Sequence, residues 1–457
     1  MADRVNDVHS RLNATQVSEV LRPRDIGELR AAVVSQDKLA VSGCRHAMGG
    51  QQFAGGEALL DLREMSRIVN FDAEAGLLEM EAGATWPTVI EATTDLQPDG
   101  QFWAIRQKQT GADDLSLGGA VSANVHGRGL GMKPLVDDIE ALQIVTADGE
   151  LVRCSRAMNS ELFRHVVGGY GLFGVIATVT LRLGRRRRLR RLVDVLDLDE
   201  AIPAVRRRAS EGCIYGDFQY VIDTDDDGFL RRGVCACYTP VETDESAGNP
   251  APAMSSGDWA KLIALAYTDK AAAFGLYAQH YLGTHGNTYW SDDMQLSTYL
   301  PNYAELIPGG ENESLMIGEM YVPPENLLEF MEQGRRILRS LGVENIYGTV
   351  RTIQPESDTA LPWAKQHWAC VIFNLRTAHT DAGRMRTAKA FGKLIDAALS
   401  YRGSFYLTYG RYADRKQIER AYPEFDTFLN AKRSLDPAGR FTSDWYRHHR
   451  KLFGRRE

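Results

Sequence analysis

Two glycine-rich stretches in the first third of the chain hold residues suited to contacting a phosphate group. The first, SGCRHAMGG, spans residues 42–50 directly after an expected strand, and the second runs from Thr110 to Gly129. Such loops offer consecutive backbone N–H groups to phosphate oxygens, because glycine leaves the backbone unobstructed. Neither stretch is followed by Gly-Lys-Ser/Thr, so neither is a P-loop. Spacing alone makes them weak candidates for a phosphate site.

A third glycine cluster, Gly169-Tyr-Gly171-Leu-Phe-Gly174, matches the GxGxxG spacing of dinucleotide-binding motifs. That motif needs a strand before it and a helix after it, so that the pyrophosphate meets the helix N-terminus. Here a helix is expected over 159–167, before the glycines, and a strand over 175–183, after them. A nicotinamide-binding Rossmann site is therefore not expected, and the glycines should cap the helix and permit close approach of backbone or ligand.

Composition and charge exclude several classes of protein. The 457 residues suffice for two or three domains, and 44% hydrophobic with 25% charged residues is ordinary globular composition. The 53 basic and 60 acidic residues give a net charge of −7, which argues against nucleic acid as a partner. The six cysteines show no CxxC pair, and the acidic turn at 223–228 lacks the glutamate of a calcium loop, so no metal is expected. Without an apolar leader or a long apolar span, we expect a cytoplasmic protein.

Hydrophobic periodicity and turn residues predict two mixed regions of helices and strands. In the first region the expected strands span 39–43, 58–62, 68–72, 77–83, 141–154 (a hairpin) and 175–183, and the expected helices span 23–36, 86–96 and 159–167. In the second, strands are expected near 214–222, 229–238, 314–322, 346–353 and 368–376, and helices near 257–282, 324–341 and 382–400. The arginine run at 184–191 predicts a solvated connector between the regions, with peripheral contact to an anionic membrane as the less favoured alternative.

The order and spacing of these segments resemble the vanillyl-alcohol-oxidase family, whose FAD domain is called PCMH-type. The resemblance covers residues 15–185 and includes SGCRHAMGG, TGADDLSLGGAVSANVHG, ADGELVRCS and NSELFRHVVGGYGLFGVI. Cytokinin dehydrogenases and alditol oxidases are similar in this part, and decaprenylphosphoryl-ribose oxidase is similar over nearly the whole chain. The resemblance implies an α+β, two-domain fold: an FAD-binding domain at 1–186, a cap domain built on an antiparallel sheet at 187–403, and a C-terminal segment at 404–457 that completes the first.

The resemblance also implies which residues bind FAD. His46 stands where many members bond covalently to the flavin, although Arg45 replaces the preceding glycine; a histidine held only by hydrogen bonds is the alternative. The second glycine stretch holds no cysteine between 110 and 127, so at most one covalent bond is expected. The expected cofactor contacts are Ser42, Gly43, Cys44, Arg45, His46, Ala47, Met48, Gly49, Thr110, Gly111, Ala112, Asp113, Ser116, Gly118, Gly119, Ser122, His126, Gly171, Val175, Ile176 and Tyr409.

On the substrate side the resemblance implies a set of strand residues. The candidates for catalysis are Glu319, Tyr409, Arg351 and His126, and those for substrate binding are Trp368, Cys370 and Asn374. For His126 the alternative is a histidine that only contacts the polar edge of FAD, and for each of the others it is an ordinary position on a sheet face. In the decaprenylphosphoryl-ribose enzymes a lysine aligns with Tyr409 and a glutamine with Glu319, so their lipid-linked sugar substrate is not carried over.

These residues lead to one expected function and two rivals. We expect an FAD-dependent oxidoreductase that oxidises a CH–OH group of a small alcohol, polyol or sugar-like substrate by hydride transfer to flavin N5. Oxygen or another acceptor would then take the electrons, and Glu319 or Tyr409 would accept the hydroxyl proton. The rivals are a reductase of the same fold acting on a C=C bond, as sterol-reductase relatives do, and a flavin-binding electron carrier without turnover.

Overall fold

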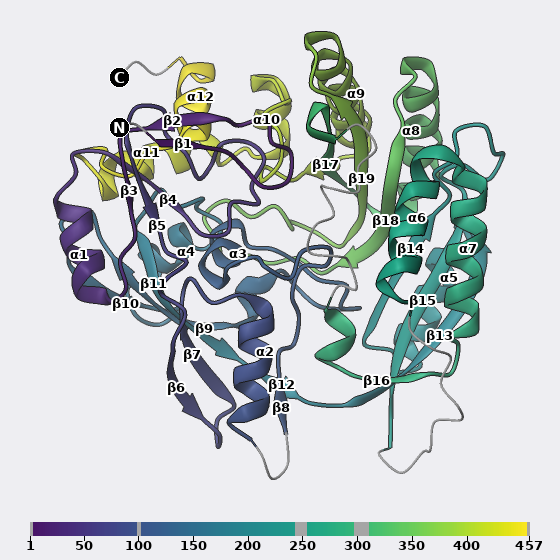
Figure 1. Ribbon diagram of the computed structural model, residues 1–457, viewed down its shortest axis with the longest axis horizontal. Helices are drawn as coiled ribbons and strands as arrows, with labels where there is room; N and C mark the ends of the chain where they lie inside the picture. Colours follow the sequence, from purple (N-terminus) through teal and green to yellow (C-terminus); the bar gives the residue numbers. More distant parts are fainter. Residues whose placement is uncertain (1–2, 98–101, 243–253, 297–309, 455–457) are drawn as a thin grey trace.

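The computed structural model describes residues 3–97, 102–242, 254–296 and 310–454 (Figure 1). Within these ranges, helices and strands are mixed in an α+β arrangement, as predicted. Small sheets occupy the first 185 residues, and one large antiparallel sheet holds most of the strands that follow.

The first part of the chain contains a three-stranded parallel sheet of order β3-β5-β4 and a five-stranded antiparallel sheet of order β10-β9-β11-β7-β6. Their strands are β3 (Val20–Leu21), β4 (Leu39–Ser42), β5 (Ala58–Asp61), β6 (Ile68–Asp72), β7 (Leu77–Glu81), β9 (Ile139–Val145), β10 (Leu151–Cys154) and β11 (Val175–Arg182). Two further pairs are β1 (Asp3–Val5) with β2 (Thr15–Val17), and β8 (Trp103–Ala104) with β12 (Gly184–Arg185). Each strand predicted here is present within a few residues.

The helices of this part begin where the sequence places capping residues. They are α1 (Ile26–Val34), α2 (Trp86–Asp95), α3 (Leu117–Ala123) and α4 (Ser160–Val166). The Asp25 side chain accepts from the N–H of Glu28 at the start of α1, and Ser116 accepts from Gly119 at the start of α3. The predicted order of helix, glycines and strand is confirmed, because α4 precedes Gly169 and β11 follows the cluster.

The large sheet has the strand order β16-β13-β15-β14-β18-β19-β17-β20. Its strands are β13 (Arg188–Asp197), β14 (Tyr215–Tyr220), β15 (Arg232–Val241), β16 (Thr288–Trp290), β17 (Glu313–Val322), β18 (Asn345–Ile353), β19 (Trp368–Ala378) and β20 (Ser404–Phe405). Its helices are α5 (Leu198–Ser210), α6 (Ser256–Thr268), α7 (Lys270–Gly283), α8 (Leu327–Leu341) and α9 (Asp381–Ser400).

Alternate residues of the strands separate the two faces of this sheet. Cys235 of β15 contacts Arg208 of α5, whereas its neighbour Val234 packs in the cluster that contains Tyr277 of α7. On β17, Gly318 lies against Phe391 of α9 and has no room for a side chain. Helices α5, α8 and α9 therefore cover one face, and the other face is left for α6, α7 and the first part of the chain.

The prediction of a solvated connector at 184–191 is wrong. Residues from Arg188 onward form β13, which pairs with β15 over its whole length and with β16 over three residues. The arginines have local partners that the charge count does not reveal: Arg186 pairs with Asp292 at 2.9 Å, and the Arg191 guanidinium lies 4.3 Å from the Tyr289 ring. Neutralised and stacked in this way, an arginine-rich run is compatible with a strand.

A single helix predicted near 257–282 is in fact two, α6 and α7. Asp269 lies between them, and its side chain accepts from the N–H of Ala272 to cap the second helix. The two helices pack against each other as a hairpin.

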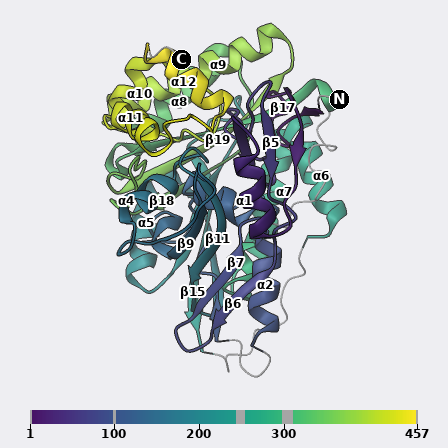
Figure 2. The same ribbon diagram turned by 90° about the vertical axis from the view of Figure 1, so that its left-hand side faces the viewer.

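The C-terminal segment returns to the first part of the chain. It forms α10 (Arg415–Ala421), α11 (Phe425–Leu435) and α12 (Asp444–Leu452), which gather at one end of the molecule in Figure 2. Phe441 forms a parallel bridge with Leu39, and the Trp445 ring lies 4.9 Å from the Tyr170 ring. The domain boundaries at 186 and 403 stay a prediction. No helix in the described ranges is both long and apolar enough to cross a lipid bilayer.

Candidate functional site

A cavity of about 810 Å³ lies between the first part of the chain and the open face of the large sheet. Most of the residues predicted to contact a cofactor or substrate line it. They are Ser42, Gly43, Cys44, Arg45, His46, Ala47, Met48, Thr110, Gly111, Ala112, Asp113, Ser116, Gly118, Gly119, Ser122, His126, Gly171, Ile176, Glu319, Arg351, Asn374 and Tyr409. The fold thus brings segments from positions 42 to 409 to one site.

Four predicted residues do not line the cavity: Gly49, Val175, Trp368 and Cys370. Val175 is fully buried in the core. Trp368 is also buried, and its indole N–H donates to the carbonyl of Trp363 at 3.1 Å. Cys370 lies behind two cavity residues, as described below. Trp368 and Cys370 share a face of β19 with the lining residues Ile372 and Asn374, but neighbours cover them. Val175 points away from the cavity, because the next residue of β11, Ile176, lines it. We therefore no longer expect any of the four to contact a ligand directly.

The two glycine stretches pack directly against each other. A Cβ atom on Gly43 would lie 1.9 Å from the Ser116 hydroxyl, so only glycine allows this contact. A Cβ on Gly118 would lie 2.8 Å from that of Ala82, at the end of β7. Gly111 has φ of +94° with nothing near its missing Cβ, so it faces open space. The glycines serve loop packing at two positions and an exposed left-handed turn at a third.

The loop at 42–50 also explains the arginine that replaces a glycine of the resembling family. Arg45 has φ of +65°, the left-handed region that favours glycine. Its Nη2 lies 2.9 Å from the Asp61 carboxylate, which anchors the residue in this conformation. The next residue, His46, lines the cavity with Nε2 3.1 Å from Asp114 Oδ1. The hydrogen bond from His46 lowers the pKa of Asp114.

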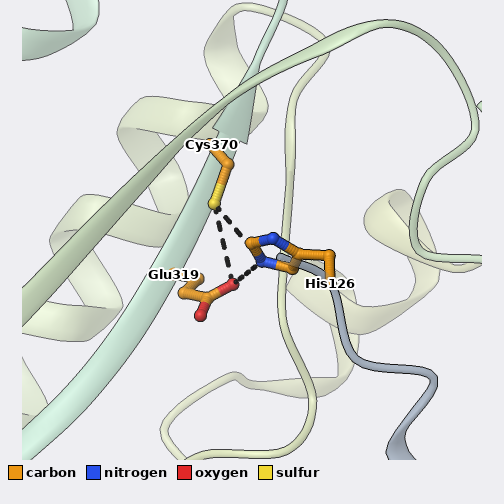
Figure 3. Close-up of side chains that lie close together, drawn as sticks. All are labelled: His126, Glu319 and Cys370. Atoms are coloured by element: carbon orange, nitrogen blue, oxygen red, sulfur yellow. Dashed lines mark hydrogen bonds and ion pairs between the residues drawn. The ribbon is translucent and has the colours of Figure 1, made fainter. Parts of the chain in front are cut away.

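Three of the four predicted catalytic residues meet in a buried cluster, and Figure 3 shows two of them, His126 and Glu319, with the neighbouring Cys370. Glu319 comes from β17, His126 follows α3, and Tyr409 follows β20. His126 Nε2 lies 2.9 Å from Glu319 Oε2, and the Tyr409 hydroxyl donates to Oε1 at 2.7 Å. The Tyr321 hydroxyl also donates to Oε2, at 2.9 Å. Cys370 Sγ stands 3.6 Å from that oxygen and 3.7 Å from His126 Nε2, on the buried side.

The contacts of His126 indicate where a proton lies. Its Nδ1 is 3.0 Å from the carbonyl oxygen of Gly127, and its Nε2 faces the carboxylate of Glu319. A carbonyl oxygen only accepts, so Nδ1 carries a hydrogen. A second proton must then lie between Nε2 and Oε2, because two lone pairs at 2.9 Å would repel. The pair of side chains therefore holds one shared proton.

The charge of Glu319 is stabilised despite its burial. Burial alone would raise the pKa of this carboxyl, but the His126 ring and the Tyr409 hydroxyl outweigh it. Together with the nearby Arg351 guanidinium they lower the pKa of Glu319 to about 2. Burial, followed by the charge of Glu319, raises the pKa of Tyr409 well above its ordinary value. At neutral pH Tyr409 is thus a protonated donor to an ionised carboxylate, and Tyr409 alone is a poor base.

The cluster of His126, Glu319 and Cys370 also has the atom types of a metal site, with ligand atoms within 4.8 Å of one another. Two tyrosine hydroxyls already donate to the same carboxylate, however, and a tetrahedral ion would need a fourth ligand. These contacts are accounted for by hydrogen bonds, and we interpret the cluster as a proton-holding group.

Some cavity residues had no signal in the sequence. They include Val8, Gln52, Gln219, Tyr347 and the inner faces of α6 and α7. None belongs to a motif, and each reaches the cavity only through tertiary packing.

Comparisons with known proteins agree with the sequence resemblance. Residues 17–155 match the family model described as an FAD binding domain. An uncharacterized oxidoreductase, ORF5 in the fasciation locus of Rhodococcoides fascians, is 34% identical over 36% of this chain and 37% of its own length. Cytokinin dehydrogenase 7 of Oryza sativa subsp. japonica is 27% identical over 71% of this chain and 59% of its own. L-gulonolactone oxidase of Mus musculus is 27% identical over 35% of this chain and 36% of its own.

In each case the chain spans less than two thirds of the relative, and the resemblance to decaprenylphosphoryl-ribose oxidase and to alditol oxidases stays a prediction.

The cavity has unsatisfied polar atoms where a cofactor would need them. Among the described residues, Gln52 Oε1 and Arg351 Nε are buried without a hydrogen-bond partner, and both residues line the cavity. A buried acceptor and a buried donor of this kind are costly unless a ligand pairs with them. With the open turn at Gly111, these atoms fit a polar, phosphate-bearing group. FAD is the cofactor of this protein, and residues 17–155 match its binding domain.

Proposed function

We propose that the protein is an FAD-dependent oxidoreductase that oxidises a CH–OH group of a small alcohol. The observation that carries the proposal is the buried Glu319 carboxylate, which lines the cavity and receives the hydroxyl of Tyr409 at 2.7 Å. A group that removes the hydroxyl proton must lie within hydrogen-bond reach of the substrate. Both residues line the cavity, so they meet this requirement for an alcohol bound there.

In the proposed reaction the substrate hydroxyl donates to the oxygen of Tyr409, and Tyr409 passes its own proton to Glu319 Oε1. The C–O bond becomes C=O as the carbon loses a hydride. Bound FAD supplies the two-electron acceptor for that hydride, and oxygen or another electron acceptor then reoxidises it. The proton between His126 and Glu319 stays on His126 Nε2, so Glu319 remains an ionised carboxylate whose Oε1 can receive the new proton. Arg351 offsets the negative charge of the site until the proton arrives.

The test is anaerobic mixing of the FAD-loaded protein with alcohols, the matching primary amines, and NADPH, each in a separate experiment. Loss of the visible flavin band with alcohols supports the proposal. Loss of the band with amines only assigns a CH–NH donor instead, and loss with NADPH alone favours a reductase. If no donor bleaches the flavin, the electron-carrier alternative replaces the proposed activity.

We also propose that FAD is attached through a single bond to His46. The supporting observation is that His46 lines the cavity with a carboxylate, Asp114, at its Nε2, which can orient the ring. Acid precipitation should leave yellow colour in the protein pellet, and His46→Ala should release all FAD to the supernatant. A colourless wild-type pellet would rule out the bond without touching the proposed reaction.

A further inference from the structure

Beyond the Glu319 cluster the cavity continues into a chamber with a different chemistry. We define the chamber by the cavity-lining side chains of α6, α7 and the strands β17 to β19 that lie past Glu319. Its walls include Ile263, Ala266, Phe274, Leu315, Ile317 and Ile372. The polar cluster and the apolar chamber are thus successive parts of one cavity.

Strand geometry sets the order and length of these parts. On β17 the side chains of Glu319, Ile317 and Leu315 point the same way, because they are two residues apart. Across the sheet, Glu319 pairs with Ile372 of β19 and Ile317 pairs with Asn374. Four residues of strand span about 13 Å, so the chamber extends about that far from the carboxylate at Glu319 to Leu315.

Helices α6 and α7 close the chamber opposite the strands. Ile263 and Ala266 lie on the buried side of α6, and Ala273 lies on the buried side of α7. All three line the cavity, as does Phe274. Alanines at two of these positions leave volume where larger side chains would fill it.

Few hydrogen-bonding groups reach the chamber. The Asn374 amide already donates to the carbonyl of Tyr347, at 3.2 Å. The lining residues of α6, α7 and β18 add the Trp259 indole and the Tyr277 and Tyr347 hydroxyls, and Gln219 of β14 adds a second amide nearby. The described lining residues of α6 and α7 carry no acidic or basic side chain. A polyol or sugar bound here would lose the hydrogen bonds that most of its hydroxyl groups make with water, and the chamber would not replace them. This loss costs roughly 1–3 kcal/mol per hydroxyl group. A hydrocarbon would lose none.

We infer that the substrate is a hydrophobic alcohol, with one hydroxyl at the Glu319 and Tyr409 end and a hydrocarbon body that fills the chamber toward α6 and α7. This inference rests on the proposed function and replaces the polyol or sugar expected from the sequence. It makes Ala266 and Ala273 determinants of substrate length.

Binding to the oxidised, FAD-loaded protein tests the inference without requiring turnover. Dissociation constants of butan-1-ol, hexan-1-ol, octan-1-ol and xylitol are measured by calorimetry, with the short alcohols in competition against octan-1-ol. Each added CH₂ should lower the dissociation constant about fourfold, and xylitol should bind more weakly than butan-1-ol. Affinity that does not depend on chain length, no binding of octan-1-ol, or tighter binding of xylitol would overturn the inference.

The flavin readout separates this inference from the proposed function. If octan-1-ol binds tightly but does not bleach the flavin, the inferred hydrocarbon binding in the chamber is supported and the proposed oxidation is wrong. If xylitol bleaches the flavin and octan-1-ol neither binds nor reacts, the oxidation stands and the chamber inference fails.

A matched pair of variants locates the binding. Ala266→Leu adds volume on the cavity side of α6, and Ala264→Leu makes the same change on the exposed side. The first should weaken octan-1-ol at least tenfold and leave butan-1-ol within twofold, whereas the second should change neither. Should Ala266→Leu fail to load FAD, Ala273→Val tests the same prediction from α7. Equal effects of Ala266→Leu and Ala264→Leu on octan-1-ol binding would contradict the inference that the alcohol lies against α6.

Discussion

The two ends of the cavity are built by different means. At the cofactor end, two glycine stretches contact each other through backbone and small side chains, such as Gly43 against Ser116. At the substrate end, the lining consists of large side chains from strands and helices far apart in sequence, such as Ile263 and Leu315. The first end is built from two short, recognisable sequence stretches and is the proposed site of the constant cofactor. The second end has no motif, and we expect its lining to vary with the substrate.

Glu319 and Tyr409 stand at the boundary between these ends. Glu319 belongs to a strand of the large sheet, and its partners His126 and Tyr409 come from the loops after α3 and β20. In the proposed reaction, proton transfer therefore depends on how the two parts of the chain pack against each other. Substitutions should divide accordingly: those in the glycine loops should reduce FAD binding, those in the chamber should change substrate preference, and those at the boundary should reduce the rate.

The largest effect is expected at that boundary. Glu319→Gln keeps the size of the side chain and an oxygen for Tyr409 but cannot take a proton at neutral pH. The rate of flavin reduction by a reactive alcohol should fall about 10²- to 10⁴-fold, the usual contribution of a general base. FAD content should not change. Stopped-flow absorbance of the visible flavin band measures the rate.

Tyr409→Phe is a second test of the same proton path. It removes the hydroxyl that relays the proton to Glu319 but leaves the carboxylate, so the rate should fall on the order of 10²-fold, the lower end of the range for Glu319→Gln. A Glu319→Gln rate within tenfold of wild type would mean that the proton goes to another group, and the boundary would lose its assigned role.

The next effect concerns the contact between the glycine loops. Gly43→Ala places a Cβ where the Ser116 hydroxyl lies, and overpacking of this kind costs about 1–3 kcal/mol. FAD should bind roughly 5- to 150-fold more weakly, measured by fluorescence titration of the apoprotein. Gly55→Ala is the control, because the nearest atom to its new Cβ is 3.8 Å away.

A second substitution shows whether the contact itself is responsible. Removing the hydroxyl in Gly43→Ala/Ser116→Gly relieves the clash, so the double variant should bind FAD more tightly than Gly43→Ala alone. Additive losses would show that the two loops act independently and that the cofactor end is not built by their contact.

Prediction from the sequence also succeeded better at the cofactor end of the cavity than at the substrate end. A cap residue such as Asp25 acts within a few positions, so helix α1 was predicted within a few residues. The short helix α3, which Ser116 caps, was not predicted. The strand β13 was missed, because the partners of the arginine run, such as Asp292 for Arg186 and Tyr289 for Arg191, lie about a hundred residues away in the sequence. The prediction placed Trp368 on the correct face of the sheet but did not foresee that neighbouring side chains bury it. The residues of α6 and α7 that line the cavity belong to no sequence motif. Local rules cannot supply contacts that only the assembled fold creates.

The smallest effect concerns the C-terminal helix α12, which packs at the cofactor end through Trp445 and Tyr170. His449 of α12 is buried 4.2 Å from the Trp445 ring. Burial lowers the pKa of His449 from 6.5 to about 3. The folded protein thus keeps this histidine neutral while the unfolded chain protonates it below about pH 6.5, so stability is lost as the pH falls.

From pH 7.5 to pH 5 this residue should cost roughly 2 kcal/mol of folding stability. Tm should therefore fall further for wild type than for His449→Gln over that interval. His448→Gln is the matched control, because His448 is the adjacent residue but only partly buried. The rise in flavin fluorescence that reports exposure of the cofactor, followed during the same heating, should shift with Tm in wild type, since α12 packs against the cofactor end. If flavin exposure and unfolding separate, or if the two histidine variants respond alike, α12 does not hold the cofactor end together, and that end rests on the glycine loops alone.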